Sequence, residues 1–157
     1  MCRVRDLLDA GVNVALGTDG AASANDIDLW NAIRLAGLLP GVVHGDPTEL
    51  SAKDLVRMAT INGGKALGVD AQVGSIEVGK RADIIVLDPL SPFSVPAFDP
   101  LGMLAYSTTR AEIKTVLVGG NLVVHDGHVV NLPADWSARV DRAAAAVAAV
   151  GHTHADA

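Results

Sequence analysis

One carboxylate stands where an α/β protein places its reactive groups. Asp19 follows the short apolar run Val12–Leu16, and Gly17 and Gly20 flank the Thr18-Asp19 pair. An apolar run of this length indicates a buried strand of a parallel sheet. In α/β barrels and doubly wound sheets, functional side chains lie at the C-terminal ends of such strands. Asp19 is therefore the leading candidate for chemistry, and the alternative is that its side chain only caps the following turn.

Other polar residues have both a functional and a structural interpretation. Ser23 and Asn25 follow Asp19 on a predicted strand-to-helix loop, where they would either line a substrate mouth or form turns and cap a helix. We favour capping. Lys80 and Asp83 belong to a short Gly-Lys-x-Ala-Asp sequence, for which a structural turn is also the simpler interpretation. Neither pair is included in the candidate site.

The histidines form no convincing metal site. His152 and His154 make a His-x-His pair, but no apolar strand precedes them to direct both imidazoles at one ion. His44, His125 and His128 lie in loop or turn sequence. We expect surface histidines and put none forward as a ligand.

The first half of the chain predicts three helices, because apolar residues recur there at helical spacing. They are Val4–Ala10 ended by Gly11, Leu29–Leu35 capped by Asp26 or Asp28 and broken by Pro40-Gly41, and Leu55–Leu67 opened by Ser51-Asp54 and ended by Gly68. A helix followed by a parallel-type strand, with polar residues just beyond it, is typical of an α/β fold.

After Gly68 the sequence changes to short β-branched runs between glycines and prolines, which indicates strands joined by rigid loops. Val116–Val118 and Leu122–Val124 flank Gly119-Gly120, a pattern that predicts a hairpin. The other predicted elements are strands in Ser75–Lys80, Ala82–Asp88 and Val129-Val130, a turn at Asp126-Gly127, and an alanine-rich helix over Trp136–Val150.

Composition limits the class of protein. The 157 residues are 50% hydrophobic, enough to bury a core. The net charge of −6 and the scattered basic residues give no support for nucleic-acid or membrane binding. The single cysteine, Cys2, excludes an internal disulfide. Because the N-terminus does not resemble a signal peptide and Ala143–Val150 is too short to span a bilayer, we expect a soluble, cytoplasmic protein.

Three stretches together resemble one enzyme family. They are LGTDGAASAND at Leu16–Asp26, GSIEVGKRADIIVLD at Gly74–Asp88 and VLVGGNLVV at Val116–Val124. In this order they resemble the amidohydrolase superfamily, most closely the methylthioadenosine/S-adenosylhomocysteine deaminases and the related triazine hydrolases. The first resembles the segment after the last barrel strand, the second the return to a small β domain, and the third the closing hairpin.

The resemblance implies an α/β fold: the last β/α unit or units of the TIM barrel of a metal-dependent hydrolase, followed by part of a small urease-like β-sandwich domain. Residues 1–72 would form the C-terminal end of the (β/α)8 barrel, 73–130 a segment of the composite β domain with a loop, and 131–157 a C-terminal helix and tail. Since such a barrel needs about 250 residues, we expect a truncated chain whose other barrel segments are encoded upstream of Met1.

The resemblance also implies hydrolysis of C–N bonds in a small molecule, with deamination of an adenine-type nucleoside as the first expectation and a triazine or other aminated heterocycle as the alternative. Asp19 matches the family's aspartate that contacts the metal and shuttles a proton. The implied cofactor is one divalent ion, zinc, with iron or manganese as alternatives. The family's His-x-His pair and further histidine ligands have no counterpart here, so we expect the chain alone to be inactive. A homo-oligomer stays open for a full-length enzyme.

A non-enzymatic interpretation is a stand-alone structural or binding module, made of the β segment and its attached helices. Such a module should unfold cooperatively without metal. A truncated barrel should instead have an incomplete core and should aggregate or unfold with poor cooperativity, because its strand edges and apolar faces lack partners.

Overall fold

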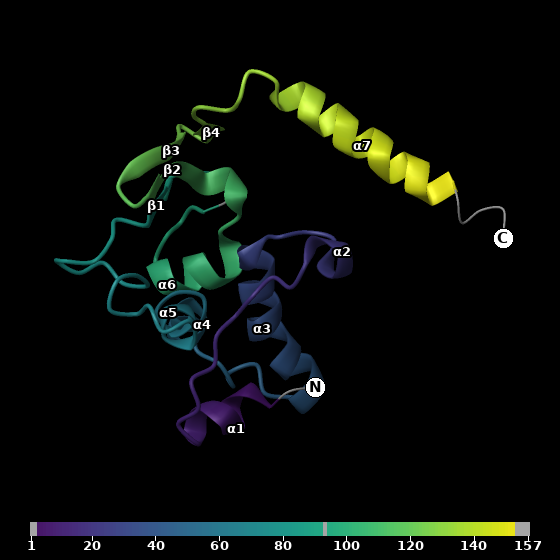
Figure 1. The fold of residues 1–157 in the computed structure, drawn as a ribbon. Coiled ribbons are helices and arrows are strands. Elements are labelled where there is room, and N and C mark those ends of the chain that lie inside the picture. Colours follow the sequence, from purple (N-terminus) through teal and green to yellow (C-terminus); the bar gives the residue numbers. More distant parts are fainter. Residues whose placement is uncertain (1–2, 93, 153–157) are drawn as a thin grey trace.

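The computed structural model describes residues 3–92 and 94–152. Figure 1 shows a body of helices with a sheet at one end, and a last helix that runs away from both. The elements in chain order are α1 Val4–Asp9, α2 Ala21–Ala24, α3 Leu29–His44, α4 Ala52–Met58, α5 Ile61–Ala66, β1 Ile84–Leu87, α6 Pro100–Gly102, the π-helix η1 Met103–Ser107, the 3-10 helix η2 Arg110–Glu112, β2 Ile113–Val118, β3 Asn121–His125, β4 His128–Val129 and α7 Trp136–His152.

The segment before Asp19 is not the buried strand that its apolar sequence predicts. No strand is assigned at residues 12–16, and the Val12 side chain is 47% exposed. The segment is held to α4 and α5 instead: the Leu16 N–H donates to the Met58 carbonyl at 2.9 Å, and the Asn62 side chain donates to the Val14 carbonyl at 2.9 Å. A strand needs a neighbouring strand to pair with, and the described part of the chain places none beside this segment.

Helix α3 begins where the sequence predicts but does not end there. Asp28 is the N-cap, and its carboxylate accepts from the Trp30 N–H at 2.9 Å. The predicted break at Pro40-Gly41 is wrong, because α3 continues through Pro40 to His44 and ends at Gly45 in the left-handed conformation. Proline costs a helix one hydrogen bond, but its fixed φ is helical, and Pro40 is buried.

The third predicted helix is two helices. Ser51 and Asp54 form the predicted capping box at the start of α4, and Gly68 follows α5 with a φ of 69°. Between α4 and α5 the chain leaves helical geometry at Thr60. The Met58 carbonyl, which a continuous helix would offer to residue 62, is taken by Leu16. A contact distant in sequence therefore interrupts the helix.

The strands form one antiparallel sheet in the order β1-β2-β3-β4. The predicted hairpin is confirmed: β2 and β3 pair, and Gly119 and Gly120 join them with positive φ angles. The strand predicted in Ser75–Lys80 is wrong, because this segment is a turn in which the Lys80 N–H donates to the Glu77 carbonyl at 3.1 Å. The predicted helix from Trp136 is confirmed as α7.

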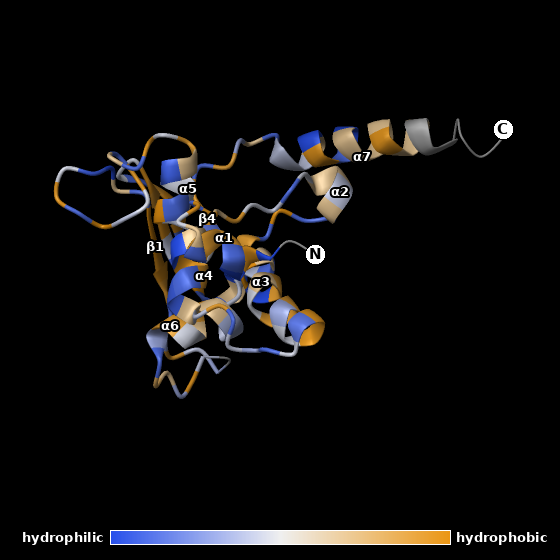
Figure 2. Cartoon of the chain, turned by 90° about the horizontal axis from the view of Figure 1, so that it is seen from below, coloured by the Kyte–Doolittle hydropathy of each residue, from blue (hydrophilic) through white to orange (hydrophobic). Residues whose placement is uncertain are grey.

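The hydrophobic core lies where α3 and α4 meet η1. It is built on the buried side chains of Ile33, Leu50, Leu55 and Ala105. Other apolar residues remain outside it, and Figure 2 shows apolar colour along the strands and α3. On α3 the Leu38 side chain is 53% exposed and that of Val42 is 82% exposed. Among the described residues, no helix has the length and apolar character that crossing a membrane requires.

Candidate functional site around Asp19

Asp19 has an unusual backbone conformation. Its φ is 62°, in the left-handed region that asparagine and aspartate tolerate better than other side chains, apart from glycine. Its Oδ1 atom accepts a hydrogen bond of 2.7 Å from the Gly20 N–H. Within the described part of the chain no donor contacts Oδ2. Strained backbone of this kind gathers at functional sites, and here it presents a carboxylate with one oxygen available.

Asp19 borders a hollow of about 490 Å³ between the α2 loop and the first half of α3. The carboxylate-bearing residues Asp26 and Asp28 line the same hollow, as do Asn31 and Arg34. Asp19 itself is exposed, whereas Asp26 and Asp28 are partly buried. The structure therefore gathers three acidic residues around one concavity.

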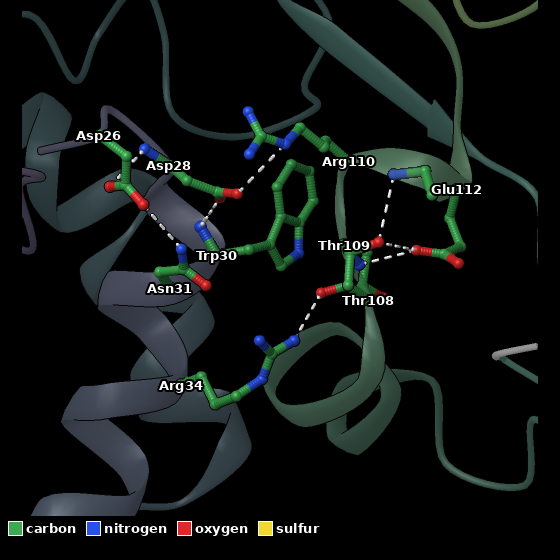
Figure 3. Close-up of polar contacts among 10 residues, drawn as sticks. Asp26, Asp28, Trp30, Asn31, Arg34, Thr108, Thr109, Arg110 and Glu112 are labelled. Atoms are coloured by element: carbon green, nitrogen blue, oxygen red, sulfur yellow. Dashed lines mark hydrogen bonds and ion pairs between the residues drawn. The ribbon is translucent and has the colours of Figure 1, made fainter.

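Asp26 and Asp28 are held by hydrogen bonds at the start of α3, as Figure 3 shows. Asp26 accepts with both oxygens: Oδ1 from the Asp28 N–H at 3.3 Å and Oδ2 from the Asn31 side-chain amide at 2.9 Å. Asp28 caps the helix and also lies 3.8 Å from the Arg110 guanidinium. These two carboxylates have structural partners, unlike the Oδ2 atom of Asp19.

A second set of contacts joins α3 to the segment before β2 (Figure 3). Arg34 donates to the carbonyl oxygens of Tyr106 and Thr108, each at 3.0 Å. Nearby, Glu112 is only 1% exposed. Burial acts to raise the pKa of Glu112, but hydrogen bonds from the N–H and hydroxyl of Thr109 and from the Ser91 hydroxyl outweigh it, so the pKa lies below the ordinary value.

The oxygen donors around Asp19 limit how a metal ion could be held. Asp19 Oδ2 is a hard, accessible oxygen of the kind that divalent ions take. Among the side chains that the structure describes, however, no three from His, Cys, Asp or Glu come close enough together to hold an ion. Asp19 therefore fits as one ligand of a larger set, and the described residues do not complete that set.

The other residues considered from sequence have structural contacts of their own. Lys80 donates to the Asp70 carbonyl at 2.5 Å and to the Ser75 hydroxyl at 2.7 Å, and Asp83 accepts from the Gly119 N–H at 2.5 Å. These contacts support the structural interpretation of that motif. Ser23 donates to the Gly20 carbonyl within the turn, and Asn25 ends α2 at a φ of 65°.

The histidines behave as surface residues where the structure describes their side chains. His44 pairs with Glu49 at 2.6 Å, and His128 contacts the Asp126 backbone carbonyl at 2.8 Å. His154 lies outside the described residues, so the His-x-His interpretation is untested. Sequence reasoning overlooked Asn31 and Arg34. Asn31 stands three residues after the Asp28 N-cap, but its side-chain amide donates to Asp26 and forms no capping box. No local sequence signal therefore marks Asn31 or Arg34.

Known proteins resemble most of the chain. The sequence model of the Amidohydrolase family matches residues 1–123. A 5-methylthioadenosine/S-adenosylhomocysteine deaminase from Moorella thermoacetica is 41% identical over 132 residues, which are 84% of this chain and 31% of that protein. The crystal structure of an adenosine deaminase from Xanthomonas campestris with bound zinc superposes with a TM-score of 0.85 at 34% identity, covering 90% of this chain and 33% of the other.

A second similar solved structure is that of an enzyme named for a different substrate. An atrazine chlorohydrolase from Arthrobacter aurescens TC1, crystallised with zinc, superposes with a TM-score of 0.76 at 30% identity, covering 93% of this chain and 31% of that one. The chain thus spans about a third of the length of each of these proteins.

Proposed function

The chain belongs to the amidohydrolase family, and on that premise we propose that it forms the C-terminal part of a metal-dependent hydrolase of C–N bonds. Residues 1–72 would end the barrel, 73–130 would contribute to the β domain, and 131–157 would add the last helix and tail. The observation that carries the proposal is Asp19, whose left-handed backbone presents a carboxylate to a hollow.

Asp19 would act as both metal ligand and proton carrier. A bound divalent ion, zinc before iron or manganese, supplies a nucleophile at neutral pH by lowering the pKa of water to about 7. Asp19 Oδ2 would hold the ion together with ligands beyond the described residues. The carboxylate would accept the proton of the attacking water and return it to the leaving amine. The hydrogen bond from the Gly20 N–H to Oδ1 keeps the carboxylate oriented for this role.

The first proposed substrate class is an adenine-type nucleoside. It is supported by the similarity to a 5-methylthioadenosine/S-adenosylhomocysteine deaminase and to an adenosine deaminase. The alternative is a triazine or another aminated heterocycle, supported by the similarity to the atrazine chlorohydrolase. Because these 157 residues place one metal ligand, we propose that they have no hydrolytic activity by themselves.

A chimera tests the role of Asp19. Residues 3–130 replace the matching third of the Moorella deaminase, and zinc-dependent ammonia release from methylthioadenosine is measured. We expect activity in the chimera and a loss of about 10²-fold or more on Asp19→Asn, since general acid–base catalysis contributes that much. Asp46→Asn is the matched control, because among the described residues Asp46 accepts only from Thr48, in a separate loop. An Asp19→Asn chimera as active as its parent would overturn the proposal.

A second chimera separates the substrate classes. The same residues replace the matching part of the Arthrobacter enzyme, and each chimera is compared with its own unmodified parent. Greater retained activity in the deaminase chimera supports the nucleoside class. Greater retained activity in the atrazine chimera supports the alternative.

A further inference from the structure

The segment that carries Asp19 has few attachments to the rest of the molecule. Its last hydrogen bond to another part of the described chain before Asp19 is that of the Leu16 N–H to the Met58 carbonyl. Within the described part of the chain, every hydrogen bond of residues 17–25 stays inside that segment: Thr18 with Asp19, Asp19 with Gly20, and Ser23 and Ala24 with Gly20. Nearly all of these residues are exposed. The conformation of Asp19 therefore depends on where the segment is fixed again.

That fixed point is Asp26. Its Oδ2 atom accepts from the Asn31 side-chain amide at 2.9 Å, and its Oδ1 atom accepts from the Asp28 N–H at 3.3 Å (Figure 3). Asn31 lies in the first turn of α3. Helix α3 is itself anchored by the buried Ile33 and by the two hydrogen bonds that Arg34 donates across to η1 and Thr108.

We propose that Asp26 is a positioning residue: through its contact with Asn31 it fixes the segment that presents Asp19. This inference rests on the proposed function of Asp19. Asp26 lines the same hollow as Asp19, so a role as a second ligand or base is the competing assignment. Both of its oxygens, however, already accept hydrogen bonds from the start of α3. The carboxylate of Asp26 therefore serves the contact with α3, because its two oxygens accept from two donors at once.

Amide hydrogen exchange in the Moorella chimera, without added metal, gives a readout that does not depend on activity. The probes are the amides of Gly20, Ser23 and Ala24, which are hydrogen-bonded within the segment. We expect Asp26→Ala and Asn31→Ala each to speed exchange at these amides by about tenfold, the effect of losing one charge-assisted hydrogen bond. The amide of the fully buried Leu55 reports whether the variant remains folded.

Two further variants separate positioning from direct chemistry. In the exchanged pair D26N/N31D, the amide of residue 26 donates to the carboxylate of residue 31, so the contact is restored and the exchange rates should return to within about twofold of the parent. Asp46→Ala removes a carboxylate that accepts from Thr48 in another exposed loop. This control should leave the three probes unchanged.

In the Moorella chimera the same variants report on catalysis. Asp26→Ala and Asn31→Ala should each lower kcat with KM retained, the double alanine variant should be no worse than either single variant, and D26N/N31D should recover kcat. Unchanged exchange in both alanine variants overturns the positioning role. Loss of kcat in Asp26→Ala but not in Asn31→Ala, without rescue by the exchanged pair, overturns it in favour of direct chemistry. A chimera that is indifferent to Asp19→Asn refutes the proposed function instead, and the exchange data still decide the role of Asp26.

Discussion

Arg34 donates a hydrogen bond of 3.0 Å to the carbonyl oxygen of Thr108, a residue 74 positions further along the chain. A second bond from the same guanidinium reaches the Tyr106 carbonyl. Thr108 is fully buried, so its carbonyl depends on a protein donor. One side chain on α3 thus ties the helix beside Asp19 to the segment that leads into the sheet.

Replacing Arg34 should loosen this connection. Lysine keeps the charge but lacks the forked geometry that serves two carbonyls at once, so Arg34→Lys should cost about 1–3 kcal/mol of local stability. Hydrogen exchange at the Thr108 amide, which donates to the Met103 carbonyl, measures the effect. Arg57→Lys is the control, because Arg57 is exposed and its side chain makes no ion pair or hydrogen bond in the described residues. Equal effects of the two changes would refute the assigned role.

Gly37 lets α3 approach its neighbours closely. An added Cβ would lie 2.8 Å from the Leu55 side chain and 2.8 Å from the Tyr106 ring. Alanine gains about 1 kcal/mol of helix propensity over glycine, but overpacking costs about 1–3 kcal/mol. We therefore expect Gly37→Ala to be neutral or destabilising in urea titrations. Gly63→Ala in α5, where nothing lies within 4 Å of the new atom, should be stabilising.

Glu112 should make the segment before β2 sensitive to acid. Its pKa in the folded chain lies below 4.5, because the Thr109 and Ser91 hydrogen bonds outweigh burial. A carboxyl group with a lowered pKa contributes stability that is fully present above the unfolded value and is lost as pH falls through the folded value. The Thr109 amide donates to Glu112 at 2.7 Å. Its protection from exchange should therefore decrease in the parent chain once the pH drops below 4.5. In Glu112→Gln the protection of the Thr109 amide should already be lower at neutral pH, and it should change little on acidification.

The 157-residue chain should neither bind zinc tightly nor deaminate methylthioadenosine. Its described residues bring no three metal-ligand side chains together, and one carboxylate is too few ligands for a catalytic site. Equilibrium dialysis with zinc and an ammonia assay on the purified chain test both statements. Measurable zinc-dependent deamination by the chain alone would contradict them. A sharp cooperative melt without metal would favour the stand-alone module.

Local sequence signals predicted the elements that local contacts stabilise. Ser51 and Asp54 form their capping box because both partners lie within one helical turn. Gly119 and Gly120 adopt positive φ angles because glycine has no Cβ to oppose a tight hairpin turn. For the same reason the start of α3 at Asp28 followed from sequence. Family membership also followed, since three short motifs in order carry it.

Tertiary contacts decided the structure of the other segments, because they join residues whose spacing in the sequence does not predict a contact. Val12–Leu16 has the composition of a strand, yet its hydrogen bonds go back to Leu7 and across to Met58 and Asn62. Composition fixes how apolar a segment is, but a partner must lie beside it before it becomes a strand. The residues 75–80 form a turn because Lys80 reaches back to the Asp70 carbonyl.

For the candidate site, the sequence determined that a carboxylate follows an apolar run at Asp19. Only the folded chain placed Asp26 and Asn31 in contact beside it and brought Arg34 to Thr108. The physical reason is that a hydrogen bond depends on distance and direction in space. For residues that are close in sequence, the backbone dihedral angles set this distance and direction. For residues that are far apart in sequence, only the tertiary packing sets them.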